Sequence, residues 1–338
     1  MRRFRIARRV TGALLFLILC PAAHALATAE RVLTVSPDGR GDYTSIQAAF
    51  DAIPEGNTVP HVVRVRPGVY AERLTLARGK RFVSLVGESN APGDVAIRYS
   101  LSAREVIPPS TQPVGTSGSS IVIIHADDFS AENITFENSA GDVGQAVAVK
   151  ITGDRVVFRN CRFIGWQDTL YPSGGRVYFD RCHVEGRVDF IFGKSTAVFD
   201  RCTIHSKNGG YITAANTPPE QPFGFVFLDC VLTGEGAPAY LGRPWQWDRG
   251  SKAAVAFLRC EMGSHIKPEG WNRWDRPENP NLRPAENTRY YEYRCTGPGS
   301  ARAGRVEWSR ALTDEEASAY TVQNVLAGSD GWNPAAGR

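Results

Sequence analysis

Residues 155–205 read RVVFRNCRFIGWQDTLYPSGGRVYFDRCHVEGRVDFIFGKSTAVFDRCTIH, and this stretch indicates the fold. A phenylalanine stands three positions before a cysteine three times, as Phe158-x-x-Cys161, Phe179-x-x-Cys182 and Phe199-x-x-Cys202. The cysteines are 21 and 20 residues apart. A fixed period in this range is typical of repeat proteins, in which each unit buries its apolar face by stacking on the next one.

The units are predicted to be strands, because apolar and polar residues alternate with period two around each cysteine. One strand in roughly 20 residues, with turn residues between strands, predicts an all-β fold, a right-handed parallel β-helix (solenoid). Thr44-x-x-Gln47 predicts a capping box that opens a short N-terminal capping helix. Thr313-x-x-Glu316 predicts a C-terminal helix, with Ala317 among the residues that lie against the coil.

Two aspartates occupy the same place in successive units. Asp168 and Asp189 each lie seven residues after a repeat cysteine, so they should stack one rung apart, about 4.8 Å from strand to strand. Two carboxyl groups this close should not both ionise freely, and such a pair can supply a charged nucleophile and a protonated acid. The residue seven after Cys202 is Gly209, so the acidic pair should be local. Both aspartates would otherwise be ordinary turn residues.

The segments around these aspartates resemble the signature segments of pectin methylesterases (pectinesterases). The five segments, in order along the chain, are Gly144–Ala148, Gln167–Tyr171, Asp189–Gly193, Tyr211–Ala214 and Leu241–Trp245. The resemblance runs from about Leu33 to Trp332. It implies hydrolysis of the methyl esters of galacturonate in pectin to pectate and methanol, without a metal or cofactor.

The resemblance also implies roles for five residues. Asp189 is the nucleophile, and Asp168 donates a proton to methanol and then activates water. Gln145 and Gln167 offer N–H donors to the oxyanion, and Arg243 pairs with Asp189. The residue types agree with this chemistry, because no Gly-x-Ser-x-Gly segment is present and none of the six histidines lies in the five segments.

The expected substrate-binding residues are mostly apolar and come from the same segments, except Val188, which directly precedes the third one. They are Gln145, Tyr171, Val188, Phe192, Arg243 and Trp245. Plant-type family members carry a threonine near Ile121, where this chain offers only Ser119 and Ser120, so the outer subsites are left unassigned. Trp271 and Trp274 are interpreted as loop anchors rather than as sugar-binding residues.

Residues 1–25 are predicted to be a signal peptide that is cleaved before Leu26. They contain five arginines, an apolar run and the small-x-small segment Ala23-His24-Ala25. Removing these five from the 39 basic residues leaves 34 against 35 acidic ones, so the charge does not indicate nucleic-acid binding. Residues 26–338 are expected to form a single secreted or periplasmic domain, a monomer without stable membrane insertion.

Six cysteines remain after cleavage, without any Cys-x-x-Cys pair, so a zinc site is not expected. Most should be buried small residues, and stacked neighbours lie at a separation that suits a disulfide in an oxidising compartment. Cys182–Cys202 is the first candidate for a bridge, and Cys161–Cys182 is the second.

Other functions remain open for such a coil. Stacked acids about 5 Å apart also suit a retaining glycosidase. A lyase would need an acidic calcium site and a base. An esterase or thioesterase with another substrate, and a carbohydrate-binding solenoid without catalysis, are further alternatives.

Overall fold

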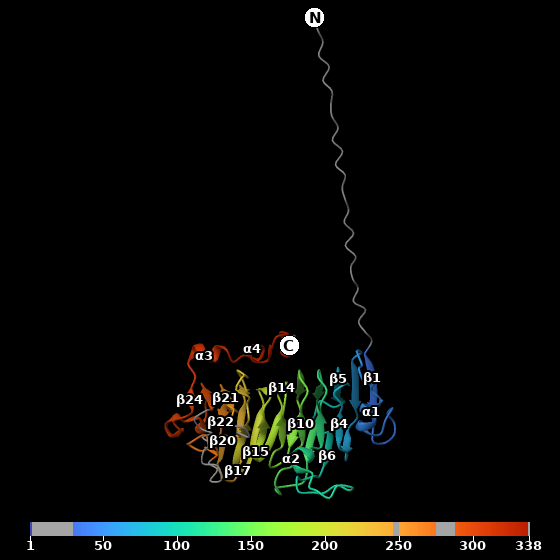
Figure 1. The fold of residues 1–338 in the computed structure, drawn as a ribbon, viewed down its shortest axis with the longest axis horizontal. Helices are drawn as coiled ribbons and strands as arrows, with labels where there is room; N and C mark the ends of the chain where they lie inside the picture. Colours follow the sequence, from blue (N-terminus) through green and yellow to red (C-terminus); the bar gives the residue numbers. More distant parts are fainter. Residues whose placement is uncertain (2–29, 246–249, 275–287, 337–338) are drawn as a thin grey trace.

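The structure, a computed structural model, describes Met1 and residues 30–245, 250–274 and 288–336. The predicted signal peptide and its cleavage position therefore lie outside the described residues, apart from Met1. Figure 1 shows strands stacked side by side along one long axis, each successive rung following the previous one in the sequence. All strand pairs are parallel. The chain is a right-handed parallel β-helix, as the cysteine period predicts.

Within the described residues, one face of the coil is an 11-stranded parallel sheet. Its strands, in spatial order, are β1 (Arg31–Val35), β2 (His61–Val65), β5 (Val83–Gly87), β8 (Ser130–Glu132), β11 (Val156–Arg159), β14 (Arg176–Asp180), β16 (Thr196–Asp200), β18 (Phe225–Leu228), β21 (Ala254–Leu258), β23 (Arg289–Tyr293) and β24 (Arg310–Ala311).

The other faces form a 13-stranded sheet with two columns of strands. One column contains β3 (Gly68–Tyr70), β6 (Val95–Tyr99), β9 (Thr135–Asn138), β12 (Arg162–Ile164), β19 (Val231–Glu235) and β22 (Glu261–Met262). The other contains β4 (Leu74–Leu76), β7 (Val122–Ile124), β10 (Val149–Ile151), β13 (Leu170–Pro172) and β20 (Ala239–Pro244). The long strands β15 (His183–Gly193) and β17 (Thr203–Ala215) pair with both columns and join them into one sheet.

The interior is built from the repeated phrase that the sequence shows. The rings of Phe158, Phe179, Phe199, Phe227 and Phe257 stack along the axis, with successive centroids 5.3, 4.5, 4.6 and 4.4 Å apart. All five side chains are fully buried. Such stacks add to the burial of apolar area and fix which rung lies on which.

The cysteines form the predicted ladder, but the predicted disulfide is wrong. Strand register places Cys161, Cys182 and Cys202 on adjacent rungs, and all six described cysteines are free thiols. The reason is the direction of the side chain. The thiol of Cys182 donates to the Phe158 carbonyl at 3.5 Å, and that of Cys202 donates to the Phe179 carbonyl at 3.4 Å.

Helix α1 (Ile46–Ala52) lies at the N-terminal end of the coil, as predicted (Figure 1). Its N-cap is Ser45, whose hydroxyl accepts from the Ala48 N–H, so the predicted capping box at Thr44 is wrong by one residue. The carboxylate of Glu72 completes the cap, because it accepts hydrogen bonds from the first two N–H groups of the helix, those of Ile46 and Gln47.

The C-terminal segment runs back over the 11-stranded sheet. After the short 3₁₀ turns η2 (Pro298–Ser300) and η3 (Arg302–Gly304), helices α3 (Asp314–Ser318) and α4 (Val322–Leu326) cover that sheet. The predicted capping box at Thr313 is present, and Ala317, Tyr320 and Val325 pack on the apolar outer face of the sheet.

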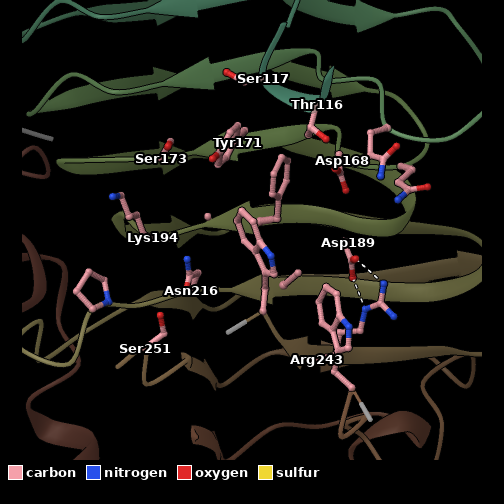
Figure 2. A pocket seen from close by; sticks show the side chains of 18 of the residues that line it. Thr116, Ser117, Asp168, Tyr171, Ser173, Asp189, Lys194, Asn216, Arg243 and Ser251 are labelled. Carbon is pink, nitrogen blue, oxygen red and sulfur yellow. Dashed lines mark hydrogen bonds and ion pairs between the residues drawn. The ribbon is translucent and has the colours of Figure 1, made fainter. Parts of the chain in front are cut away.

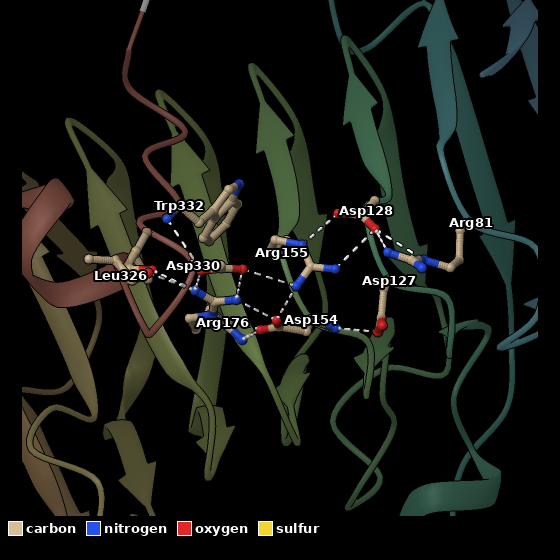
Figure 3. A network of polar contacts seen from close by, with 10 residues as sticks. Arg81, Asp127, Asp128, Asp154, Arg155, Arg176, Leu326, Asp330 and Trp332 are labelled. Carbon is tan, nitrogen blue, oxygen red and sulfur yellow. Dashed lines mark hydrogen bonds and ion pairs between the residues drawn. The ribbon is translucent and has the colours of Figure 1, made fainter. Parts of the chain in front are cut away.

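Charged side chains fix the end of this segment to four rungs. Figure 3 shows a chain of contacts from Arg81 through Asp128, Arg155 and Arg176 to the C-terminal Asp330. Arg176 donates to Asp330, to Asp154 and to the carbonyls of Leu326 and Ala327. The C-terminal segment is therefore part of the coil's structure and lies on the sheet away from the site described next.

Candidate active site

Strand register aligns the two aspartates as predicted. Gln167 pairs with Val188, and Leu170 pairs with Ile191. Both pairs are 21 residues apart, so Asp168 and Asp189, which lie between them, occupy the same position on adjacent rungs. Adjacent parallel strands are about 4.8 Å apart. The 21-residue interval between Cys161 and Cys182 therefore correctly predicted that the backbone positions of Asp168 and Asp189 are aligned.

Both aspartates also have the backbone conformation of turn residues. Asp168 has a φ of 64° and Asp189 a φ of 51°, in the left-handed region that aspartate tolerates better than most residues. The acidic pair is local, as predicted, but the residue on the next rung is not Gly209, the one that counting from Cys202 gives. The register between β15 and β17 shifts after Gly186, and Tyr211 becomes the partner of Val188. A second irregularity lies between Val188 and Ile191, and the residue between their partners Tyr211 and Thr213 is the buried, apolar Ile212. No third acid therefore follows Asp189 in this column.

The aspartates face a cleft of about 1090 Å³ on the 13-stranded sheet (Figure 2). It brings together every predicted site residue except Val188, which lies in the column of Gln145 and Gln167 but does not line the cleft. The predicted residues that line it are Gln145, Gln167, Asp168, Tyr171, Asp189, Phe192, Arg243 and Trp245.

Arg243 holds Asp189 with both arms of its guanidinium. Its Nε lies 2.8 Å from Asp189 Oδ1, and one terminal nitrogen lies 2.6 Å from Oδ2. The guanidinium itself is held between two aromatic rings, 3.9 Å from the centroid of Tyr211 and 3.8 Å from that of Trp274. A bidentate, stacked arginine of this kind fixes both the charge and the orientation of a carboxylate.

Gly242 is needed for this placement, because β20 passes very close to β17. A Cβ atom at Gly242 would collide with the hydroxyl and backbone of Thr213. Gly242 pairs with Thr213, and Arg243 then pairs with Ala214. The glycine in the segment Leu241–Trp245 therefore sets the depth at which Arg243 emerges into the cleft.

Asp168 is in a different electrostatic environment from Asp189. Burial raises the pKa of the Asp168 carboxyl well above its ordinary value, the nearby Asp189 raises it further, and Arg243 opposes the rise. Only 7% of Asp168 is exposed, and no ion pair with a cation is found for it among the described residues. One carboxyl of the pair is thus held as an anion by arginine, and the other favours its protonated form, which is the arrangement that acid–base catalysis needs.

The two glutamines are fixed by backbone pairing at the same end of the cleft. Gln145 pairs with Gln167, and Gln167 with Val188, as single bridges between rungs. The carbonyl of Gln145 accepts from the N–H of Ala103, and that of Gln167 accepts from Ala146. Both side chains line the cleft next to the aspartates, so their amide N–H groups can donate to an anion formed there.

Three aromatic side chains form an apolar wall in the middle of the cleft. The rings of Tyr171 and Phe192 stack with centroids 4.1 Å apart, and the ring of Trp245 lies 5.7 Å from that of Phe192. Phe192 also packs on the buried Val147. The wall lies between the carboxyl groups and the polar residues Ser173 and Lys194 (Figure 2).

Sequence reasoning missed several lining residues. Helix α2 (Gly115–Gly118) presents Thr116 and Ser117 to the cleft, whereas Ser119 and Ser120 are buried and donate to the carbonyls of Thr116 and Ser117.

Trp271 is a core anchor, as predicted, and it stacks on Tyr290 with centroids 4.1 Å apart. Trp274 lines the cleft and covers Arg243 instead. No periodicity marks Trp274, because it lies in an irregular, proline-rich part of the sequence.

Comparisons with known proteins identify the family of this chain. The sequence model of the family Pectinesterase matches residues 32–329. Pectinesterase 31 of Arabidopsis thaliana is 44% identical over 303 residues, which cover 88% of this chain and 92% of that protein. Pectinesterase QRT1 of Arabidopsis thaliana is 36% identical, with 90% of this chain and 79% of that protein covered.

Solved structures show the same fold. The pectin methylesterase from carrot superposes with a TM-score of 0.79 at 30% identity, covering 88% of this chain and 93% of that one. Pectin methylesterase PemA from Erwinia chrysanthemi gives 0.77 at 32%, covering 90% and 98%. A further neighbour, with a TM-score of 0.77 at 32% identity and coverage of 89% and 98%, is a pectin methylesterase in complex with a hexasaccharide. From its sequence, its fold and the residues gathered in its cleft, the chain belongs to the pectinesterase family.

Proposed function

We propose that this carboxylic ester hydrolase removes methyl groups from galacturonate units of pectin, with Asp189 as nucleophile and Asp168 as acid and base. The observation that carries the proposal is that the two stacked carboxyl groups have different electrostatic environments. Asp189 is held by both arms of Arg243, and the pKa of the buried Asp168 is raised. Pectin is the substrate that the names of the similar proteins indicate.

The first half of the reaction forms an acyl enzyme. A carboxylate oxygen of Asp189 attacks the carbonyl carbon of the methyl ester, and the bond to the methoxy oxygen breaks. The proton of Asp168 passes to that oxygen, so methanol leaves and Asp168 becomes a carboxylate. A mixed anhydride then joins Asp189 to the galacturonyl group.

The second half restores both aspartates. Asp168, now a base, takes one proton from water, and the resulting hydroxide attacks the galacturonyl carbonyl carbon. The anhydride bond to Asp189 breaks, which returns Asp189 as a carboxylate and Asp168 as an acid. The product is a galacturonic acid unit, which loses its proton to solvent. Acid–base assistance of this kind is typically worth about 10²–10⁴-fold in rate.

The remaining cleft residues bind and orient the ester in this scheme. The amides of Gln145 and Gln167 donate to the oxyanion of each tetrahedral intermediate. Tyr171, Phe192 and Trp245 offer apolar surface to the sugar face and the methyl group, which a charged wall would not bind. Val188 would contribute through the backbone that aligns Gln167 and Asp189.

Two alternatives on the same coil fit less well. A retaining glycosidase would use the same pair of acids. It has no need of two amide donors beside them or of an arginine fork that lowers the basicity of its nucleophile. A lyase would need acidic ligands for calcium. Here Arg243 pairs with Asp189, and the raised pKa of Asp168 favours its protonated form. An ester of another alcohol would fit the same machinery, and the substrate assay separates it.

The surroundings of the enzyme are also part of the proposal. Residues 1–25 would direct export, and residues 26–338 would act as one monomeric domain outside the cytoplasm, where pectin is found. Among the described residues, no helix is both long and apolar enough to cross a membrane. The plant relatives are pectinesterases, which is consistent with action on a cell-wall polymer.

Methanol release tests the proposal. The purified protein should release methanol from highly methylated pectin and none from fully de-esterified pectate. It should leave the chain length of both polymers unchanged. Asp189→Asn, purified in the same way and shown to be folded, should release none. Shortening of the polymer without methanol would indicate a glycosidase or lyase, and hydrolysis of other esters without any methanol from pectin would indicate a different substrate.

A further inference from the structure

A lysine occupies the end of the cleft opposite the carboxyl pair. Lys194 directly follows β15, and register places Ser173 and Asn216 beside it on the neighbouring rungs. Figure 2 shows these three side chains on one side of the cleft and Asp168, Asp189 and Arg243 on the other. Lys194 is the fifth residue after Asp189, and five residues of extended chain span about 16 Å between Cα atoms. Lys194 therefore cannot reach the ester under attack.

Within the part of the chain that the structure describes, the charge of Lys194 has no partner. Its backbone is fixed, because its N–H donates to the Pro172 carbonyl and its carbonyl accepts from Gln221 Nε2. Its ammonium makes no ion pair with any residue of the described ranges, and the side chain is exposed. By contrast, Arg243, which also lines the cleft, is neutralised by Asp189.

Among the residues whose structure is described, one acid lies at the same end. Glu220 lines the cleft after Pro218 and Pro219, is exposed, and forms no ion pair with Lys194. Because both side chains are in water, neither charge cancels the other at short range, and each acts on what the cleft binds. The end of the cleft thus offers one free ammonium together with the polar side chains Ser173 and Asn216.

The proposed substrate gives this ammonium a partner. Each galacturonate unit of pectin carries a neutral methyl ester or a free carboxylate at the same carbon. We propose, building on the proposed function, that Lys194 is a specificity-determining residue that binds the free carboxylate of a unit some distance along the chain from the reacting ester. The enzyme then favours esters in pectin that is already partly de-esterified.

The expected effect is moderate, because the contact is exposed. A lysine–carboxylate pair in water changes affinity by up to about fivefold. Lys194→Gln should therefore lower kcat/KM about two- to fivefold on a hexagalacturonate in which alternate units carry free carboxylates. It should leave kcat/KM on the fully methyl-esterified hexamer unchanged. The preference is the ratio of kcat/KM on the alternating hexamer to kcat/KM on the fully esterified one. In 1 M NaCl, where the Debye length is about 3 Å, this ratio should fall in the wild type to the value of the variant.

Two matched variants separate a local charge effect from other causes. Arg64→Gln removes one exposed positive charge from β2, which contributes no residue to the cleft, and should leave the ratio of the two kcat/KM values unchanged. Glu220→Gln changes the same end of the cleft without removing a cation, and should not lower the ratio. The proposal would be overturned if either variant lowered the ratio of the two kcat/KM values as much as Lys194→Gln does.

The same proposal fails if Lys194→Gln changes both substrates equally or changes neither. That outcome differs from failure of the proposed function, in which the wild-type enzyme would release methanol from neither hexamer.

Discussion

Replacing Arg243 by lysine isolates what the bidentate contact contributes. Lysine keeps the positive charge beside Asp189 but offers a single point contact in place of the two hydrogen bonds at 2.8 and 2.6 Å. It also loses the flat group that Tyr211 and Trp274 enclose. The substitution therefore tests orientation of the carboxylate more than its charge.

The size of the loss follows from these contacts. A hydrogen bond to a charged group contributes about 1.5–3 kcal/mol. Because about 1.4 kcal/mol corresponds to a factor of ten, losing one of the two bonds should lower kcat/KM for methanol release about 10- to 150-fold.

The assay is kcat/KM on methylated pectin between pH 4 and 9, expressed per folded molecule. Arg305→Lys is the matched control, since Arg305 makes a bidentate contact to Glu292 that is more deeply buried than the Arg243–Asp189 pair, and neither Arg305 nor Glu292 lines the cleft. That control should lower thermal stability and leave kcat/KM unchanged. An Arg243→Lys enzyme within twofold of the wild type, or an equal loss of kcat/KM in Arg305→Lys, would refute the reasoning.

Three further predictions concern stability and binding. Asp168→Asn should raise the Tm at pH 7 but not at pH 3. Because the pKa of Asp168 is raised in the folded state, the wild type loses stability as the pH rises from the ordinary aspartate pKa near 3.8 toward the pKa of the folded state. Asparagine does not titrate, so the variant avoids this loss. An equal rise in Tm at pH 3 and pH 7 would contradict this. Arg176→Met should lower the Tm by about 4 °C or more without changing kcat/KM, whereas Arg98→Met, which breaks an exposed pair, should lower it by less than about 2 °C. Trp245→Ala should weaken turnover of the polymer at unchanged Tm, and the reverse pattern would assign Trp245 to the core.

Much of the site follows from spacing in the sequence. The 21-residue interval between Cys161 and Cys182 is the rung repeat, so the alignment of Asp168 with Asp189 follows without a structure. Tyr171 and Phe192 are also 21 residues apart, so they stack on the same face of adjacent rungs.

Other features depend on contacts between distant residues, which spacing does not show. The N-cap of α1 is completed by Glu72, 26 residues after Ile46, so a local capping box gave the wrong residue. A register shift inside β15 and β17 displaced Gly209 from the column that simple counting gave it. The disulfide was wrong because stacked cysteines can direct their thiols to carbonyls. The contact of Trp274 with Arg243 joins an irregular segment to β20, which no pattern along the chain predicts.

The central claim is the division of labour between the two aspartates, and one comparison tests it directly. Asp168→Asn and Asp189→Asn are each assayed on a methyl ester and on an aryl ester of the same galacturonate oligomer, whose phenolate leaves without protonation. On the methyl ester, Asp168→Asn should lose about 10²–10⁴-fold and Asp189→Asn all enzymatic turnover. On the aryl ester, Asp168→Asn should regain acyl transfer, seen as a burst of phenolate, whereas Asp189→Asn should show none. A burst from Asp189→Asn, with none from Asp168→Asn, would contradict the account and reverse the two roles.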